Sequence, residues 1–320
     1  MHIWWLKNTI MGMSLAASWA WGASFAVTIA LFETLGILPA IIWVTMNIFA
    51  LPVFGLVYGV LPSFKNLKET CWFVKPSMVF VMVCSIWMNM QALYTIALRV
   101  GITDFSAIAG TLLLSSTILL MIAYGGLKWS IISDVWQYIL MMIGIVILFF
   151  LSGVELWNGA VAPTLQWGIN HIPFALWIGL TLWAGPLLDA MHWERHAVSD
   201  GQPSFNRGGM FFGCYIILVS MLAFLPSGGL LYGGIMLFVV MMVATSTLDS
   251  SASGLQYLAG KKWGIAVGAI SVLSWPLIVP LGVINLFTFY GTFRILVVAL
   301  MFGILYLRKT YGQMSYGTNK

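Results

Sequence analysis

Uninterrupted apolar segments of about twenty residues recur along nearly the whole chain. In one of them, residues 131–152, the only charged residue is Asp134. A helix needs about 20 apolar residues to cross the hydrocarbon core of a bilayer. Transmembrane strands would instead alternate polar and apolar residues over segments of about ten. The segments therefore predict a protein built of membrane-spanning helices.

The composition agrees with this prediction and narrows the class of protein further. Of the 320 residues, 61% are hydrophobic and 7% are charged, whereas soluble domains carry roughly a quarter charged residues. The net charge of +5 does not indicate a nucleic-acid-binding protein, because the basic residues cluster between the apolar segments. The three cysteines, Cys71, Cys84 and Cys214, lie in or beside apolar segments and suggest no disulfide framework.

Ten spans are predicted, and the basic residues orient them. The spans lie at about 12–32, 36–59, 74–98, 105–124, 131–152, 171–193, 208–225, 229–256, 263–281 and 284–307. Lys and Arg are enriched in cytoplasmic loops. With the N-terminus inside, the cytoplasmic side holds Lys7, Lys65, Lys68, Lys75, Lys128, Arg195, Arg207, Lys261, Lys262, Arg308, Lys309 and Lys320. Arg99 alone falls outside and Arg294 falls within the tenth span. We expect a multi-pass protein of the cell membrane with both termini in the cytoplasm.

The ten spans divide into two halves of five, at about residues 8–155 and 165–310, within one transmembrane domain covering residues 1–320. An odd number of spans per half inverts the second half, an arrangement common in secondary transporters. The first span contains Ala20-Trp21-Gly22-Ala23-Ser24, and the sixth contains Trp183-Ala184-Gly185-Pro186. Breaks in corresponding helices indicate a binding site between the halves, although Gly and Pro are also simply frequent in membrane helices. The predicted fold is all-α, with ten transmembrane helices in an inverted repeat and discontinuous helices 1 and 6.

Two polar segments interrupt the apolar pattern. Gly125 and Gly126 predict a tight turn before the fifth span, where Asp134 and Gln137 share one helix face. A carboxylate near a helix N-terminus is favoured by the helix dipole, which is a purely structural explanation of Asp134. The eighth span contains the polar run 244–251, including Asp249, and intramembrane carboxylates tend to line ion or substrate paths. Hydroxyl and carbonyl oxygens suit hard cations, so we expect a sodium site between a broken first span and the hydroxyls of the eighth.

Three segments resemble the sodium:solute symporter family, which includes sodium/proline and sodium/sugar symporters. They are Gly125-Gly126-Leu127-Lys128 with Asp134 and Gln137, the run Ser246-Thr247-Leu248-Asp249-Ser250, and the run 17–25. The resemblance covers the ten-helix core, without the flanking helices that such symporters usually carry. It implies alternating access, with the solute bound near the middle of spans 1 and 6.

The resemblance also implies a particular sodium site. The ligands would be the carbonyl oxygens of Ala17, Ala20 and Val243 and the hydroxyls of Ser246 and Thr247. Asp134 would lie on the path by which sodium leaves toward the cytoplasm. Residues near the expected breaks and inside the membrane are candidates for binding the solute: Trp21, Gly22, Asn47, Trp183, Gly185, Asp189 and Arg294.

Several charged residues have alternative explanations. Asp189, His192 and His196 lie on one face of the inner end of span 6, where an interfacial cap with Glu194 and Arg195 is the simplest interpretation; a proton relay or a metal site are the others. Arg294 is too deep to flank a span and needs a partner. That partner is either a carboxylate of the protein, such as Asp189, Asp249 or Glu33, or a carboxylate of the solute.

The favoured function is a sodium-coupled symporter of a small polar organic solute, with sodium as coupling ion and no other cofactor. Its partners would be the solute, sodium and membrane lipid but no nucleic acid, and it would be a monomer or a weak homo-oligomer. A proton-coupled or facilitative carrier on the same fold is one alternative, and a non-transporting membrane sensor or partner subunit is another. An enzyme is not expected, because no nucleophile–base arrangement or cofactor loop is evident.

Overall fold

A computed structural model describes the chain except for residues 1, 62–70, 227 and 318–320; the side chains of residues 2, 3, 23, 60 and 308–317 are also not described. The described residues form helices and connecting turns, with no β-strand among them. The helices are α1 (His2–Trp19), α2 (Gly22–Thr34), α3 (Ile37–Val60), α5 (Val74–Arg99), α6 (Asp104–Trp157), α7 (Ile172–Leu188), α8 (Ala190–Val198), α9 (Gln202–Leu222), α10 (Gly229–Ala259), α11 (Lys261–Ser274) and α12 (Gly282–Gly317). Short 3-10 turns lie at Ile169–His171, Trp275–Leu277 and Val279–Leu281.

The helices have the lengths and hydropathy of membrane spans. Within the described part of the chain, seven helices are long and apolar enough to cross a membrane, and the bent pair α1–α2 makes an eighth. The all-helical, multi-pass membrane fold predicted above is therefore confirmed. Ten spans follow if the two arms of α6 are counted separately and the 14-residue α11 also crosses. The inverted repeat itself stays a prediction.

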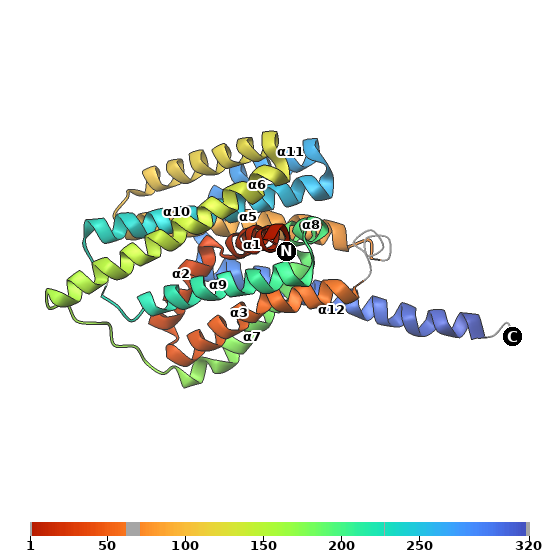
Figure 1. The fold of residues 1–320 in the computed structure, drawn as a ribbon, viewed down its shortest axis with the longest axis horizontal. Helices are drawn as coiled ribbons and strands as arrows, with labels where there is room; N and C mark the ends of the chain where they lie inside the picture. The colour runs from red at the N-terminus through yellow and green to blue at the C-terminus, as the bar shows by residue number, and fades with distance from the viewer. Residues whose placement is uncertain (1, 62–70, 227, 318–320) are drawn as a thin grey trace.

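The long helix α6 is two antiparallel arms. As a straight rod its 54 residues would extend about 80 Å, far beyond the thickness of a bilayer. Gly126 interrupts it with φ 57° and ψ −153°, a conformation that residues with a Cβ rarely adopt. In Figure 1 the yellow arm and the yellow-green arm run in opposite directions. The turn predicted at Gly125 and Gly126 is therefore confirmed.

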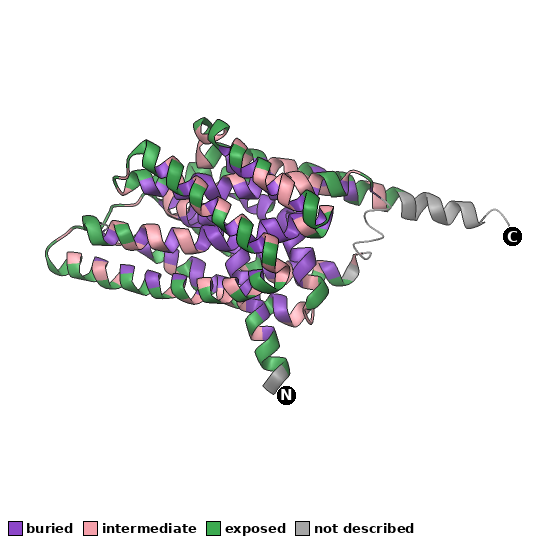
Figure 2. Cartoon of the chain, turned by 90° about the horizontal axis from the view of Figure 1, so that it is seen from above, coloured by how far each residue is buried: buried purple, intermediate pink, exposed green. Residues whose placement is uncertain are grey.

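Buried residues gather along the axis of the bundle, as Figure 2 shows. The helix α10 packs against α6 and α5, while α3 packs against α7 and α9, and α1 packs against α9 and α6. In the most apolar window of each helix, 67% of the residues of α5 are buried but only 28% of those of α6. Helix α5 is therefore an interior helix, and α6 presents most of its surface to the surroundings, where lipid would cover it.

Charged residues mark the two ends of the bundle. At the end where the N-terminus lies, Lys7 pairs with Asp200 at 2.6 Å between Nζ and Oδ1, and Asn8 donates to Oδ2. The hydrogen bond from Lys7 is the main reason why the pKa of Asp200 lies below the usual value of an aspartate. At the other end, Arg99 pairs with Glu33 at 3.0 Å. Lys65, Lys68 and Lys320 lie outside the described residues, as do the side chains of Arg308 and Lys309.

Both expected discontinuous helices are interrupted. Helices α1 and α2 meet at a 55° bend between Trp19 and Gly22, where the sequence predicts it. The second break lies at Asp189, with φ −88° and ψ 104°, three residues beyond the predicted segment 183–186, which stays helical. Proline itself has a helical φ. The helix ends further along because side chains satisfy the last carbonyls: the Tyr58 hydroxyl donates to Pro186 O and the Trp193 indole to Leu187 O.

Candidate functional site

The bend between α1 and α2 releases backbone carbonyl oxygens from their helical partners, among them those of Ala17 and Ala20. In a continuous helix the amide of Trp21 would donate to Ala17 and that of Ser24 to Ala20. Here the amide of Trp21 donates to Trp19 O at 2.9 Å, and that of Ser24 donates to Trp21 O at 2.8 Å. The carbonyls of Ala17 and Ala20 are the two that the sequence resemblance assigns to sodium.

Neighbouring helices hold this bend in place. The first amide of α2, that of Gly22, donates to Asn89 Oδ1 on α5 at 2.8 Å, which satisfies a group that the break would otherwise leave unpaired. Gly22 also lies so close to α10 that a Cβ there would be 2.8 Å from the Cβ of Ala244. The glycine therefore lets the broken segment approach the polar stretch of α10.

The hydroxyl of Thr247 in α10 contacts α1 next to the bend, whereas that of its neighbour Ser246 contacts α6. Thr247 Oγ1 lies 3.4 Å from Ser18 O in α1 and 3.4 Å from Val243 O, while Ser246 donates to Asp134 Oδ1 at 2.6 Å. Because each hydroxyl proton is directed at an acceptor, the oxygen lone pairs are available to a cation. All five implied ligands are buried: Ala17, Ala20, Val243, Ser246 and Thr247. Neutral hydroxyl and carbonyl oxygens are a donor set that fits sodium.

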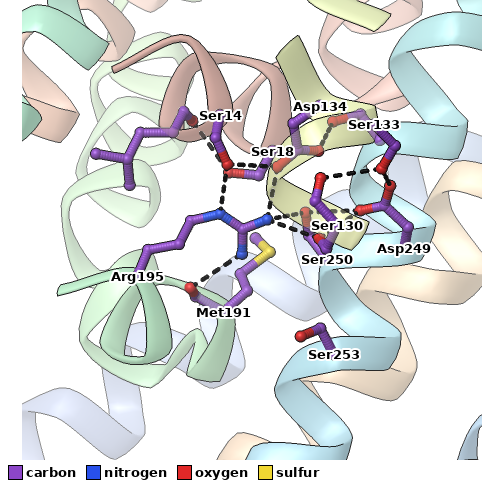
Figure 3. Close-up of polar contacts among 12 residues, drawn as sticks. Ser14, Ser18, Ser130, Ser133, Asp134, Met191, Arg195, Asp249, Ser250 and Ser253 are labelled. Carbon is purple, nitrogen blue, oxygen red and sulfur yellow. Dashed lines mark hydrogen bonds and ion pairs between the residues drawn. The ribbon is translucent and has the colours of Figure 1, made fainter. Parts of the chain in front are cut away.

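Beside these hydroxyls, Arg195 of α8 joins four helices (Figure 3). Its Nη2 donates to Asp134 Oδ2 at 2.6 Å, to Ser130 Oγ at 2.9 Å and to Ser250 Oγ at 2.8 Å. Its Nε donates to Ser14 Oγ at 3.0 Å, and Ser14 donates in turn to Asp134 Oδ2. Arg195 and Asp134 are both fully buried, so a permanent cation already neutralises the carboxylate expected on the sodium exit path.

The second carboxylate of this region, Asp249, has only hydroxyl partners among the described residues. Ser130 and Ser133 donate to its two oxygens at 2.8 Å and 2.6 Å, and Ser250 donates at 3.2 Å (Figure 3). Its side chain is 2% exposed. The region around Asp134 and Asp249 therefore holds two carboxylates and one guanidinium, leaving one ionisable group without a counter-charge in direct contact.

A second buried cluster forms where the two helix breaks meet. Arg294 of α12 lies 3.8 Å from Asp189, measured between Nη2 and Oδ2, and its guanidinium lies over the rings of Trp21 and Tyr290 at 5.3 Å and 4.4 Å. A Cβ at Gly185 would overlap that guanidinium. Of the predicted solute-binding residues, the structure thus brings together Trp21, Gly185, Asp189 and Arg294. The carboxylate partner expected for Arg294 is Asp189.

The other predicted solute-binding residues are Trp183, Asn47 and Gly22, and their described contacts are with other residues. Trp183 is 37% exposed, and its indole donates to Met46 O on α3 at 2.9 Å. Asn47 is buried on α3, and its amide nitrogen has no hydrogen-bond partner among the described residues. Gly22 contacts α5 and α10 as described above. These three predictions remain predictions.

The interfacial cap expected around residues 189–196 is wrong for its central members. Asp189, His192 and Arg195 are fully buried, and His192 Nδ1 lies 3.8 Å from Asp189 Oδ2. The break at Asp189 turns α8 back into the bundle, so its side chains meet other helices instead of headgroups. His196 packs against the rings of Tyr58 and Phe205. Among the described residues, no three His, Cys, Asp or Glu side chains are grouped closely enough to hold a metal ion.

A cavity of about 870 Å³ opens at the end of the bundle opposite the Arg195 network. It lies between α2, α5, α9 and α10, and Glu33 and Arg99, which form the ion pair described above, are among its lining residues. On α10 its lining ends at Met236, about 20 Å along the helix from Ser250. The cavity therefore lies toward the end of the bundle that carries Glu33 and Arg99, away from the Arg195 network.

Sequence reasoning missed several members of both clusters. Arg195 follows Trp193 and Glu194 in a polar segment and therefore looks like a loop residue, whereas Tyr290 looks like any aromatic residue of a span. Ser14 lies four residues before Ser18 on the same face of α1, which is a usable signal. The contact between Arg195 and Asp134 spans 61 residues of sequence, and no local pattern predicts it.

Comparisons with known proteins identify a similar fold among solved structures. No protein-family model matches the chain, and no curated protein matches it in sequence. A solved structure of a Na+-coupled sialic acid symporter, described as a substrate-bound outward-open state, aligns with a TM-score of 0.59 over 91% of this chain and 75% of the other, at 14% sequence identity. The chain is therefore an all-helical, multi-pass membrane protein that shares the fold of a Na+-coupled symporter.

Proposed function

We propose that this protein is a sodium-coupled symporter of a small polar organic solute, working by alternating access within the sodium:solute symporter family. The observation that carries the proposal is the release of the Ala17 and Ala20 carbonyls at the bend, beside the contact of the Thr247 hydroxyl with Ser18 O in α1. A fold shared with a Na+-coupled symporter supports it. The membrane is the cell membrane, with both termini in the cytoplasm.

The geometry suggests how sodium and solute are coupled. Ala20 supplies a sodium ligand, and the next residue, Trp21, places its ring over Arg294 in the second cluster. Sodium at the bend fixes the backbone on which Trp21 is carried, and a solute in contact with Trp21 fixes the same backbone. Each ligand should therefore tighten binding of the other, because coupling between two sites is reciprocal.

Sodium leaves past Asp134 in this proposal. Ser246 is a sodium ligand and also donates to Asp134, which is bound to Arg195. Release toward the cytoplasm then requires the Arg195 network to separate α8 and α1 from α6 and α10. The same contacts keep that end of the bundle closed while the cavity near Glu33 and Arg99 is open.

The sodium site can be tested without knowing the solute. The unfolding temperature of the purified protein is measured in sodium chloride and in choline chloride at equal ionic strength. We expect a saturable stabilisation by sodium. In Ser246→Ala/Thr247→Ala the sodium concentration for half-maximal stabilisation should rise at least about tenfold, because two ligands are lost.

A matched control is Ser220→Ala in α9. Ser220 is also buried, but its hydroxyl donates only to Ile216 O in its own helix, at 2.6 Å. This variant should keep the sodium response of the wild type. If the double variant keeps it too, the site is misassigned.

A second candidate function is proton-coupled transport on the same fold. Asp249 supports it, because a buried carboxylate surrounded by hydroxyls can carry a proton. A proton-coupled or facilitative carrier would take up solute equally well in sodium and in choline, across a pH series. A protein that binds solute in liposomes but never moves it would be a sensor or partner subunit instead.

A further inference from the structure

We propose that the solute carries a carboxylate, which Arg294 binds with two parallel hydrogen bonds. Next to the carboxylate the solute carries a second group, which donates a hydrogen bond to Asp189. This inference rests on the proposed transport function and names the chemical class of its solute.

The position of Arg294 requires an explanation. It is the thirteenth residue of the 36-residue helix α12 and is 1% exposed. Keeping a guanidinium inside a membrane protein costs several kcal/mol in free energy unless charged partners and hydrogen bonds compensate it. The residue is therefore expected to have a full set of partners, as Arg195 has.

Arg294 has no such set. Its Nε and Nη2 have no hydrogen-bond partner among the described residues, and the distance of 3.8 Å from Nη2 to Asp189 Oδ2 is too long for a hydrogen bond. Asp189 Oδ2 is also without a partner, while its Oδ1 accepts from Tyr290 at 3.2 Å. A donor edge and an acceptor oxygen thus face the same buried region unsatisfied.

The two unpaired nitrogens define the ligand chemistry. Nε and Nη2 lie side by side on one edge of the guanidinium, and such an edge matches the two oxygens of a carboxylate. The rings of Trp21 and Tyr290 cover the guanidinium and fix its plane. A planar, oriented fork favours a planar carboxylate over a neutral amide, which offers one acceptor oxygen where the fork has two donors.

Gly185 shows how the fork is covered in this state. The atoms nearest to a Cβ at this position would be Nη2, Cζ and Nε of Arg294, so the paired edge lies against the backbone of α7. Gly185 is four residues before the break at Asp189. A pivot of α7 at that break would uncover the fork and Asp189 together, which ties access to the fork to the conformational change of transport.

Charge balance selects among carboxylates. Arg294 and Asp189 neutralise each other, so a solute whose own charges cancel keeps the buried site neutral. An α-amino acid does this, with its ammonium group at Asp189 and its carboxylate at Arg294. A hydroxy acid offers a neutral donor instead and would add one negative charge. We therefore expect amino acids to bind more tightly than hydroxy acids.

The test compares each acid with its own primary amide. The probes are L-proline and prolinamide, L-serine and serinamide, and lactate and lactamide, all in saturating sodium, with the shift in unfolding temperature as readout. At least one acid should stabilise the wild-type protein. Its amide should bind about tenfold to a hundredfold more weakly, since it leaves one donor of the fork unpaired.

Two variants locate the effect. Arg294→Lys keeps the charge but not the fork, and Gly185→Ala displaces the guanidinium; both should abolish the preference for the acid. Arg207→Lys is the matched control, because Arg207 also lies over two rings, those of Trp4 and Trp5 at 5.4 Å, but at the end of the bundle. It should keep the preference.

The outcomes separate this inference from the proposed function. If no acid binds at millimolar concentrations, or if acids and amides bind equally in the wild-type protein, the inference is overturned even where sodium stabilises the protein. If an acid binds through Arg294 and sodium has no effect, the solute class stands and sodium coupling fails. Comparing each acid with its amide in the wild-type protein tests the solute class even where a variant does not fold.

Discussion

Two buried arginines, Arg195 and Arg294, differ in how completely their donors are used. Arg195 donates to hydroxyls, to a carboxylate and to the carbonyl of Met191. Arg294 keeps a two-donor edge without partners. A buried charge with a full set of partners holds structure together, whereas one with unsatisfied donors is available to a ligand. The difference supports the proposed roles of Arg195 in closing the bundle and of Arg294 in binding the solute.

Removing the Arg195 side chain should therefore reduce stability strongly. Arg195→Met leaves Asp134 buried without its counter-charge, which should lower the free energy of unfolding by about 3–5 kcal/mol. Arg195→Met/Asp134→Asn removes both charges and should be less destabilised than Arg195→Met alone. Chemical unfolding in detergent measures both values. Equal losses in the single and double variants would show that the two residues do not act as a pair.

At the scale of elements, the two candidate sites lie at the breaks between α1 and α2 and between α7 and α8. Each break releases backbone groups, and each is stabilised by side chains of other helices: Asn89 at the first, and Tyr58 and Trp193 at the second. Gly22 allows α2 to approach α10 closely next to the first break. The proposed sodium site would therefore depend on helix spacing as well as on its ligands.

A methyl group at Gly22 should widen this spacing. Gly22→Ala would place a Cβ 2.8 Å from that of Ala244, forcing α2 away from α10. Separation of the carbonyls from the hydroxyls should raise the sodium concentration for half-maximal stabilisation about tenfold or more. Gly234→Ala, in α10 itself, is the control, because nothing lies within 4 Å of a Cβ there. An unchanged sodium response in Gly22→Ala would contradict the close approach.

At the scale of the whole molecule, the described residues place different features at the two ends of the bundle. The Arg195 network fastens α1 and α8 to α6 and α10 at one end, while the cavity of about 870 Å³ enters at the other. For the proposed transporter, this arrangement would correspond to a state closed toward one side of the membrane and open toward the other. In the proposed orientation the cavity faces outward.

Cysteine labelling tests that asymmetry along one helix. In a background with Cys71, Cys84 and Cys214 replaced by alanine, Met236→Cys lines the cavity and Leu255→Cys lies beyond the network on α10. A membrane-impermeant thiol reagent added outside intact cells should label Met236→Cys and leave Leu255→Cys unmodified. Labelling of Leu255→Cys alone would reverse the orientation.

Some features of the sites were within reach of the sequence. Gly126, the polar run containing Ser246, Thr247 and Asp249, and the break near Trp21 are local signals, and the structure places each where the pattern predicts. The position of the second break was three residues off, since it depends on Tyr58 and Trp193 rather than on Pro186 alone. No local pattern predicts the partners of Arg195. For Arg294 the sequence offered several carboxylates as partner, and Asp189 was one of them.

The sequence by itself determined that this protein lies in a lipid bilayer and that its fold is built of helices. A bilayer cannot hydrogen-bond to a backbone, so apolar runs of about twenty residues must become helices, whatever their neighbours are. Only the tertiary structure decided which polar groups meet. Desolvated charges select their partners through distance and orientation in three dimensions, and the contacts of Asp134 with Arg195 and of Asp189 with Arg294 join residues far apart in the chain.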